Sequence, residues 1–332
     1  MKKTLIAASI AALTATSANA AVKLYESETG SFSSYGRIQL ELENYDGENT
    51  IQNQGSRLGF SGDTQLDNGM TAFTNFEFRF QPGLRNDTAM NVRNSYLGVK
   101  GDFGSIKAGN IDSIVYSMVT EQADIFENKG YRSLDEGENN SRATSIVYET
   151  NDLNGFKVAA NIKHYASNES QYAGAGAPLE SADGDEQWNL QLGVSYQLND
   201  ELSFALAFDQ NNEDGNPSVG VVGDADPVIA ASVNYATDAF GAGVVLENSG
   251  DYMVANLTGS VNYGAGDVYA LVSFMDNDVD TGVDFGLGVN YKMDKAFLVY
   301  GEVAVGNDDV SSIQDSKNEG TAAVTVGAAY KW

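Results

Sequence analysis

The chain has 332 residues and a formal net charge of −27 at pH 7, with 46 Asp and Glu against 19 Lys and Arg. This sign excludes nucleic acid as a partner, because binding to nucleic acid depends on neutralising phosphates with Lys and Arg. The absence of cysteine excludes a disulfide framework and thiol chemistry.

The first twenty residues predict an export signal. Met1-Lys2-Lys3 precedes an apolar run over 5–13, and Ala18-Asn19-Ala20 forms a small-residue cleavage site. The run is far shorter than the roughly 20 residues that a spanning helix needs. We therefore expect residues 1–20 to be a signal peptide and residues 21–332 to form one exported domain. In a membrane that domain must be a closed barrel, since only helices and barrels satisfy every backbone group there.

From residue 32 onward the sequence shows about sixteen segments of roughly ten residues, the length of a tilted membrane strand. Apolar and polar residues alternate in them, most clearly over 188–196 and 283–291. A period of two predicts strands with one apolar and one polar face. Polar residues such as Gln191 and Asp284 are then expected to face a water-filled interior. The predicted segments are 32–42, 54–64, 69–80, 91–100, 103–109, 142–150, 155–165, 187–197, 201–210, 228–236, 240–248, 252–263, 267–275, 283–292, 296–305 and 321–332.

The connections between these segments alternate between short and long. Short turns at 101–104, 151–154 and 199–201 contrast with long polar stretches such as 110–141 and 166–186. Short turns on one rim and long loops on the other are typical of an outer-membrane β-barrel. The connection at 249–251 is shorter than this rule expects.

The last predicted strand, 321–332, places apolar or aromatic residues at its even positions and ends on Tyr330-Lys331-Trp332. Aromatic rings at a strand end are typical of the membrane–water interface. We predict that Tyr330 and Trp332 form a C-terminal membrane-assembly signal. A soluble β-sandwich could use the same alternation, so this segment alone leaves both readings open.

Several short motifs resemble one family. They are Tyr-Gly-Arg at 35–37, Gly-Ser-Arg-Leu-Gly-Phe-Ser-Gly at 55–62, and Leu-Gly-Val-Lys at 97–100 followed by Phe-Gly-Ser-Ile-Lys-Ala-Gly at 103–109. Together with the export signal and the terminal aromatic, they resemble the general diffusion porins of Gram-negative outer membranes, most closely the OmpU-type members. The resemblance implies an all-β fold: a 16-stranded antiparallel transmembrane β-barrel with a long, inward-folded third extracellular loop.

The resemblance also implies partners and a location. We expect a homotrimer in the outer membrane that contacts outer-membrane lipid and lipopolysaccharide, depends on the outer-membrane assembly machinery, and passes small hydrophilic solutes and ions. Because the chain is acidic, lipopolysaccharide is reached only through divalent cations or local basic patches. No cofactor or metal is expected. The stretch 276–282 resembles a calcium loop, but its glycine falls one place late and Leu287 stands where the bidentate Glu belongs.

In the family, basic side chains line the pore wall opposite the inward loop. Alternation predicts that Arg37, Arg57 and Arg79 face inward, because the apolar residues at 38 and 40, at 58 and 60, and at 76 and 78 take the outer face. Arg93 matches by its distance to 98–100, and Arg142 by its place after the long loop, while alternation leaves both directions open. The competing interpretation for each arginine is an ordinary solvated charge.

The stretch 110–141 is the candidate constriction loop. We predict that its apolar residues at 114, 115, 119, 125 and 126 hold it against the barrel wall. Glu121, Asp124 and Glu127 are then expected to face the arginines. The family's Pro-Glu-Phe-Gly-Gly element is absent, so the sequence leaves open which acid lies at the narrowest point.

Opposed acids and bases across a narrow pore predict passive diffusion selected by size and charge. Because the mouth is acidic and the loop is rich in acids, we expect a weak to moderate preference for cations. The alternative is a barrel that acts mainly as an adhesin or receptor through its acidic loops. A soluble secreted β protein is a further alternative. An enzyme is not expected, because the chain has a single histidine, His164, with Ser167 nearby.

Overall fold

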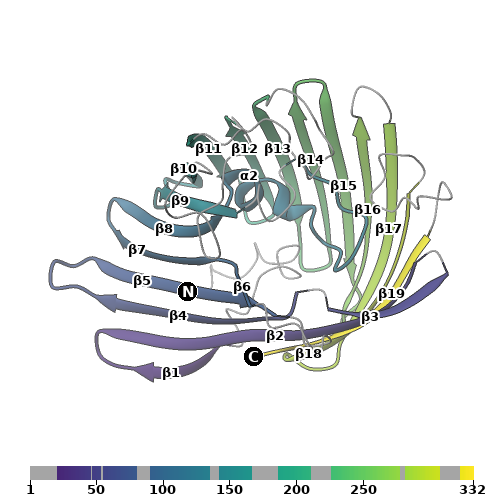
Figure 1. Ribbon diagram of the computed structural model, residues 1–332, viewed down its shortest axis with the longest axis horizontal. Helices are drawn as coiled ribbons and strands as arrows, with labels where there is room; N and C mark the ends of the chain where they lie inside the picture. The colour runs from purple at the N-terminus through teal and green to yellow at the C-terminus, as the bar shows by residue number, and fades with distance from the viewer. Residues whose placement is uncertain are drawn as a thin grey trace.

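The computed structural model describes residues 21–45, 47–53, 55–80, 90–134, 142–166, 186–210, 226–276, 281–306 and 322–332. Its main sheet is a closed ring (Figure 1), because each barrel strand pairs antiparallel with the next and the last strand, β19, pairs with the first, β2. The predicted signal peptide, residues 1–20, lies outside the described residues.

Sixteen strands make up the ring, and each matches one predicted segment. They are β2 (Gly30–Tyr45), β4 (Arg57–Gln65), β5 (Thr71–Arg79), β7 (Ser95–Gly101), β8 (Gly104–Asp112), β9 (Arg142–Glu149), β10 (Phe156–Tyr165), β11 (Gln187–Gln197), β12 (Leu202–Asp209), β13 (Val228–Ala236), β14 (Phe240–Ser249), β15 (Tyr252–Asn262), β16 (Asp267–Asp276), β17 (Thr281–Lys292), β18 (Phe297–Gly306) and β19 (Ala322–Lys331). The predicted 16-stranded antiparallel barrel is confirmed.

Three shorter strands of the described chain were not predicted. β1 (Val22–Glu26) pairs with the first half of β2, β3 (Glu48–Gln52) pairs with its second half, and β6 (Asn91–Val92) pairs with the end of β5. β19 also pairs with the second half of β2, so β1 continues the line of β19 along β2. The two ends of the described chain therefore meet beside one strand.

Alternation along the strands separates two faces. On β2, Ile38, Leu40 and Leu42 are exposed, whereas Gln39 and Glu41 are buried. The same exposed apolar face continues around the ring, for example at Leu206, Leu257 and Phe285. An apolar outer belt on a closed barrel matches the hydrocarbon of a membrane, because water would be excluded from it. The described residues contain no helix of the length and apolar character that a membrane span requires.

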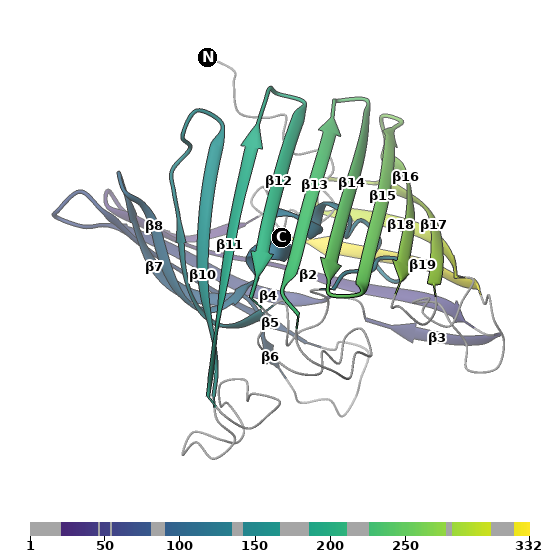
Figure 2. The same cartoon turned by 90° about the horizontal axis from the view of Figure 1, so that it is seen from above.

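The connections lie on two unlike rims. Residues 66–70, 102–103, 150–155, 198–201, 237–239, 263–266 and 293–296 connect strands at one rim, called here the short-turn rim. Figure 2 shows the turns after β11 and β13 side by side on that rim. The opposite rim, the long-loop rim, carries the connections that begin after β2, β5, β8, β10, β12, β14, β16 and β18. Its connection at 250–251 is short, as the sequence indicated.

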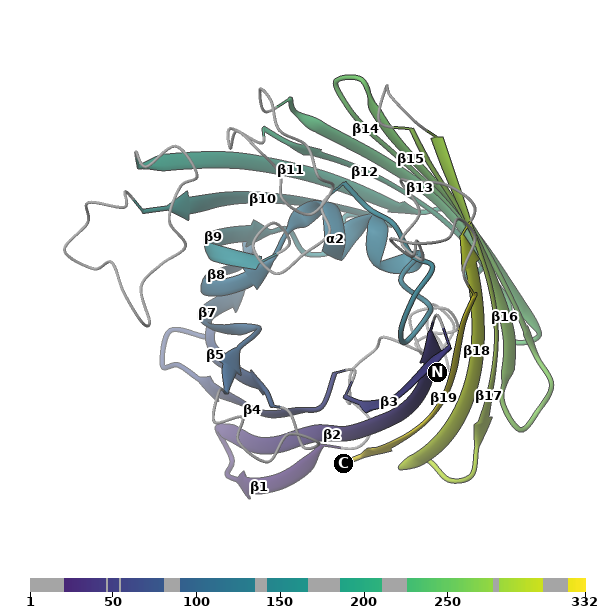
Figure 3. The same cartoon turned by 45° about the vertical axis from the view of Figure 1, so that its right-hand side comes forward.

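The chain between β8 and β9 turns into the barrel and is called here the inward loop, residues 113–134. Ser113 begins α2 (Ile114–Met118) by accepting a hydrogen bond from the Tyr116 backbone N–H, and the 3-10 turn η1 (Thr120–Gln122) follows. Figure 3 shows α2 inside the ring of strands. Capping by a serine side chain satisfies a donor that the first turn leaves free.

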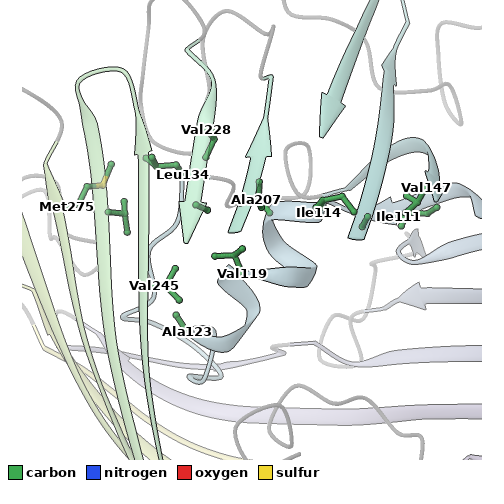
Figure 4. Packing of buried hydrophobic residues seen from close by; sticks show 14 residues of the cluster. Ile111, Ile114, Val119, Ala123, Leu134, Val147, Ala207, Val228, Val245 and Met275 are labelled. Atoms are coloured by element: carbon green, nitrogen blue, oxygen red, sulfur yellow. The ribbon is translucent and has the colours of Figure 1, made fainter. Parts of the chain in front are cut away.

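The inward loop is held by apolar packing against the barrel wall. Ile114, Val115 and Val119 are almost fully buried, in one cluster with small wall residues such as Ala207 and Ala230 (Figure 4). A second cluster joins the loop residues Ile125 and Phe126 to β16 by way of Tyr269 and Leu271. The predicted apolar anchoring of the loop is confirmed.

Candidate functional site

A cavity of about 460 Å³ lies between the inward loop and the strands on the opposite side of the barrel. Loop residues Glu121, Asp124 and Glu127 line one side. Polar and charged residues from β2, β4, β5 and the chain after β6 line the other side. The predicted loop acids and most of the predicted arginines therefore border one space. The arginines that line it are Arg37, Arg57, Arg79 and Arg93.

Three of these arginines occupy neighbouring positions across the sheet. Arg37 pairs in register with Arg57, and Arg57 pairs in register with Arg79. Paired positions on adjacent strands project to the same face about 5 Å apart. The three guanidinium groups thus form a row on the lumen face, as alternation predicted for each of them.

Glu77 lies among the arginines and was not predicted. Its carboxylate is 3.4 Å from Arg93 Nη1 and 4.0 Å from Arg57 Nε, and its side chain is 5% exposed. Glu77 also lies two residues before Arg79, so it shares the inward face of β5. The same alternation that predicted Arg79 could have found Glu77. It holds two arginines of the wall at a fixed spacing.

Glu127 joins the tip of the inward loop to β2. Its carboxylate is 3.0 Å from Arg37 Nη2 and accepts a hydrogen bond of 3.0 Å from the Gln39 amide. Its backbone N–H donates to Glu302 on β18. Burial alone would raise the pKa of Glu127, but Arg37, Gln39 and the nearby cations Lys331 and Arg57 together outweigh burial and lower the pKa below its usual value.

Asn128 extends this attachment, because its amide donates to Glu43 on β2 and to Thr325 on β19. The loop tip therefore contacts three consecutive barrel strands, β18, β19 and β2. Charge-assisted bonds at a low exposure make this a firm attachment rather than a surface contact.

Asp124 has a different environment from Glu127. It accepts a hydrogen bond of 2.9 Å from the Tyr116 hydroxyl, and this bond partly offsets the effect of burial. Burial raises the pKa of Asp124, and the nearby Glu127 raises it further. Burial and Asp124 together raise the pKa of Tyr116, which keeps its hydroxyl proton. Asp124 is thus the loop acid that takes up a proton more readily than an ordinary aspartate.

Arg142 is the first residue of β9, in register with Asp112. Its side chain lies outside the described residues. Asp112 itself lines the cavity and accepts a hydrogen bond from Asn94.

Some polar residues that the sequence assigned to a water-filled lumen instead hold the inward loop. Gln191 accepts the Ile114 backbone N–H at 3.0 Å, and Asp284 lies 3.6 Å from Arg132 Nε. Both side chains do point inward, as alternation predicted, and both are almost fully buried. The prediction that they contact water was wrong, because the loop covers this part of the wall.

His164 lies at the outer surface near the long-loop rim. Its ring is 4.3 Å from that of Trp188, and its Nε2 is 3.2 Å from the Glu186 carboxylate. Ser167 falls outside the described residues. Nor does the described part of the chain hold a group of three or more His, Asp or Glu side chains suited to a metal ion.

The chain is similar to known proteins both in sequence and in fold. Residues 7–332 match the family model described as Gram-negative porin. The major outer membrane protein P.IB of Neisseria lactamica is 27% identical, with all of both chains covered. A monosaccharide porin of Halomonas is 23% identical, covering 85% of this chain and 81% of the relative. Outer membrane protein U of Vibrio vulnificus is 27% identical, covering 68% of this chain and 72% of the relative.

Two solved structures illustrate the likeness in fold. The anion-selective porin from Comamonas acidovorans has a TM-score of 0.68 at 20% identity, covering 91% of this chain and all of that one. OmpT of Vibrio cholerae, an outer membrane protein in its trimer form, has a TM-score of 0.63 at 18% identity, covering 92% of this chain and all of that one.

Proposed function

The chain belongs to the Gram-negative porin family and is an outer-membrane channel, and on this premise we propose that its constriction admits small hydrophilic solutes and ions by passive diffusion and prefers cations. The observation that carries the proposal is a cavity that has the loop acids on one side and a row of arginines on the other. The family and fold are those of non-enzymatic channels.

Opposed charges across a narrow, partly desolvated passage create a field transverse to the pore. Such a field orients polar solutes and disfavours apolar ones that cannot replace their water. Its strength depends on the low-dielectric walls, while salt screens it over roughly 8 Å at physiological ionic strength. No bound intermediate is needed, so size and charge alone select the solute.

The preference for cations is supported by the charges at the constriction. Its lining carries five carboxylates, from Asp112, Asp124 and three glutamates, against four arginines. This balance is close to neutral, so we expect a weak preference. The overall charge of −27 favours cations in the approaches to the pore. The fold does not decide the sign, because the Comamonas relative of the same fold is anion-selective by name.

We further propose a homotrimer, supported by the trimer form of the Vibrio cholerae protein. Tyr330 and Trp332 support an assembly signal read by the outer-membrane machinery, since their rings lie 6.4 Å apart at the end of β19 and Tyr330 is exposed. Lipopolysaccharide contact, mediated by divalent cations, and removal of residues 1–20 complete the proposal. The adhesin or receptor alternative depends on the long acidic connections, and these fall mostly outside the described residues. The channel is therefore the function that the described geometry supports best.

The test is the reversal potential of the purified protein in a planar bilayer under a salt gradient. We expect current steps in groups of three and a reversal potential that favours cations. An anion-favouring potential would overturn the charge assignment while leaving the channel. Silence from correctly folded protein would overturn the channel itself.

A further inference from the structure

Lys331 is a charged lumen residue that the sequence pattern had placed only on the polar face of the last strand. On β19 the buried residues Ala323, Thr325 and Ala329 occupy odd positions and face inward, whereas Tyr330 is exposed on the outer face. Lys331 also occupies an odd position and therefore points into the barrel. The Trp332 ring closes the outer surface over Gly36, where any side chain would clash with it.

Lys331 extends the basic row to a fourth strand. It pairs in register with Arg37, which pairs with Arg57, which pairs with Arg79. The four adjacent strands β19, β2, β4 and β5 thus each carry a basic residue in this row, which runs across the strands along the pairing direction. At about 4.8 Å per strand the row is about 14 Å long.

The row is inclined relative to the membrane. Lys331 ends β19 at the short-turn rim, where its backbone N–H donates to Ala296 in the turn 293–296. Arg57 begins β4 and Arg79 ends β5, both at the ends nearer the long-loop rim. Barrel strands tilt by roughly 35–45°, so a row across them climbs the wall. It runs from the periplasmic rim, where porins have their short turns, up to the constriction.

Lys331 is half-buried on the inward face of β19. Its ammonium interacts electrostatically with Arg37, Glu127 and Arg57. Within the described residues no carboxylate forms an ion pair with Lys331. Arg37 next to it is neutralised by Glu127 at 3.0 Å. Lys331 therefore supplies positive charge at a point of the row where the arginine is already compensated.

We propose that Lys331 is a specificity-determining residue of this channel. It forms the periplasmic start of the inclined basic row, and its positive charge favours anions and opposes cations on their way to the constriction. The proposal rests on the proposed function, because it needs a conducting pore whose selectivity is set by charge. It does not depend on whether the net preference is for cations or anions.

The experiment compares Lys331→Gln, Lys331→Arg and the matched control Lys157→Gln by reversal potential at about 0.1 M salt. Lys157 lies at the same rim on β10, on the wall that carries the inward loop. It faces inward, because it alternates in step with the buried residues Ala159 and Asn161. We expect Lys331→Gln to raise the cation-to-anion permeability ratio about twofold, because one unit charge at about 10 Å in water, screened at this salt concentration, acts with opposite sign on cations and anions. Lys331→Arg should keep the wild-type ratio. Equal shifts for Lys331→Gln and Lys157→Gln would overturn the proposal.

A second variant covers the case in which Lys331→Gln does not assemble. The chain has no cysteine, so Lys331→Cys provides a unique thiol that can be modified from the periplasmic side after folding. A cationic thiol reagent should restore the wild-type ratio, and an anionic reagent should raise the ratio beyond that of the unmodified variant. No response to either reagent in a conducting pore would refute the role of Lys331. A wild-type protein that folds but does not conduct would instead refute the proposed function.

Discussion

The barrel has two unlike inner walls. On one side β2, β4 and β5 present Arg37, Arg57 and Arg79 to the cavity. On the other side β10 to β15 present small residues such as Ala207 and Ala230, and these pack against the inward loop. The first wall, called here the basic wall, borders the cavity with charged side chains. The second, called here the loop wall, is packed like the interior of a soluble protein. Inward direction alone therefore does not make a residue a pore residue.

The largest expected effect tests the packing of the loop wall. Val119 belongs to the inward loop and is fully buried against the loop wall, so Val119→Asp leaves an uncompensated charge there at a cost of roughly 3–5 kcal/mol. We expect the loop to leave the wall, the single-channel conductance to rise and the unfolding temperature to fall. Val119→Ala is the graded control and should cause a smaller loss of stability. Unchanged conductance and stability in Val119→Asp would mean that the two walls do not differ as described.

The next effect concerns the point where the inward loop crosses from one wall to the other. Glu127→Gln removes the partner of Arg37, and both side chains are only 10% exposed. Hydrogen bonds to charged groups contribute about 1.5–3 kcal/mol, so we expect a loss of unfolding free energy of about that size. Single-channel recordings should also show a noisier open state.

The control for this prediction is a double-mutant cycle with Arg37→Gln. Residues in direct contact couple, so the double variant should lose less stability than the two single variants together. Strict additivity would show that the contact does not hold the loop.

The strand pattern of this chain was predictable, because every barrel strand repeats with a period of two. That period also identified Arg37 and Arg57 as inward residues. It could not separate the two walls: Gln191 has the same polar, inward pattern as a pore residue, yet it accepts the Ile114 N–H of the inward loop. Such contacts join residues far apart in the sequence, and no local pattern records them.

Residues overlooked in the sequence have identifiable causes as well. Glu77 shares the inward face of β5 with Arg79, but an acid is not part of the pattern that predicts a basic wall. β1 was missed because Val22–Glu26 is only five residues long and follows directly on the predicted export signal. Lys331 lies between the two aromatic residues of the proposed assembly signal, and the sequence pattern gave it no role of its own.

As the pH falls, Asp124 should be protonated before Glu127. The pKa of Asp124 is raised by burial, whereas the pKa of Glu127 is lowered because Arg37, Gln39 and nearby cations together outweigh burial. An ordinary carboxyl titrates near pH 4, so Asp124 loses its charge above that pH and Glu127 below it. The stability contributed by Glu127 is complete above its unfolded pKa and is lost only as the pH falls through its lower folded pKa.

We therefore expect the cation preference to weaken on acidification, and to turn toward anions because the constriction is near charge balance, while the loop tip is still attached. Reversal potentials between pH 7 and about pH 4 measure this. Asp124→Asn should remove the upper part of the pH dependence, whereas Glu121→Gln should keep it. A dependence that survives Asp124→Asn would assign the titration to another group.

The smallest effect separates the charge of the basic wall from the packing of the loop wall. Arg79→Gln removes one charge from the far end of the basic row. We expect the reversal potential to shift modestly toward cation preference in dilute salt, since the charge of the row acts through space.

The salt dependence of this shift is the test. The Debye length falls from about 10 Å at 0.1 M to about 3 Å at 1 M salt, so the shift should almost vanish at the higher concentration. The effect of Val119→Asp on conductance should persist there, because displacement of a packed loop is not screened. Lys295→Gln, in the exposed turn 293–296, is the control for loss of a remote charge. A shift in Arg79→Gln that stays constant with salt would mean that Arg79 acts by shaping the passage and not by its field.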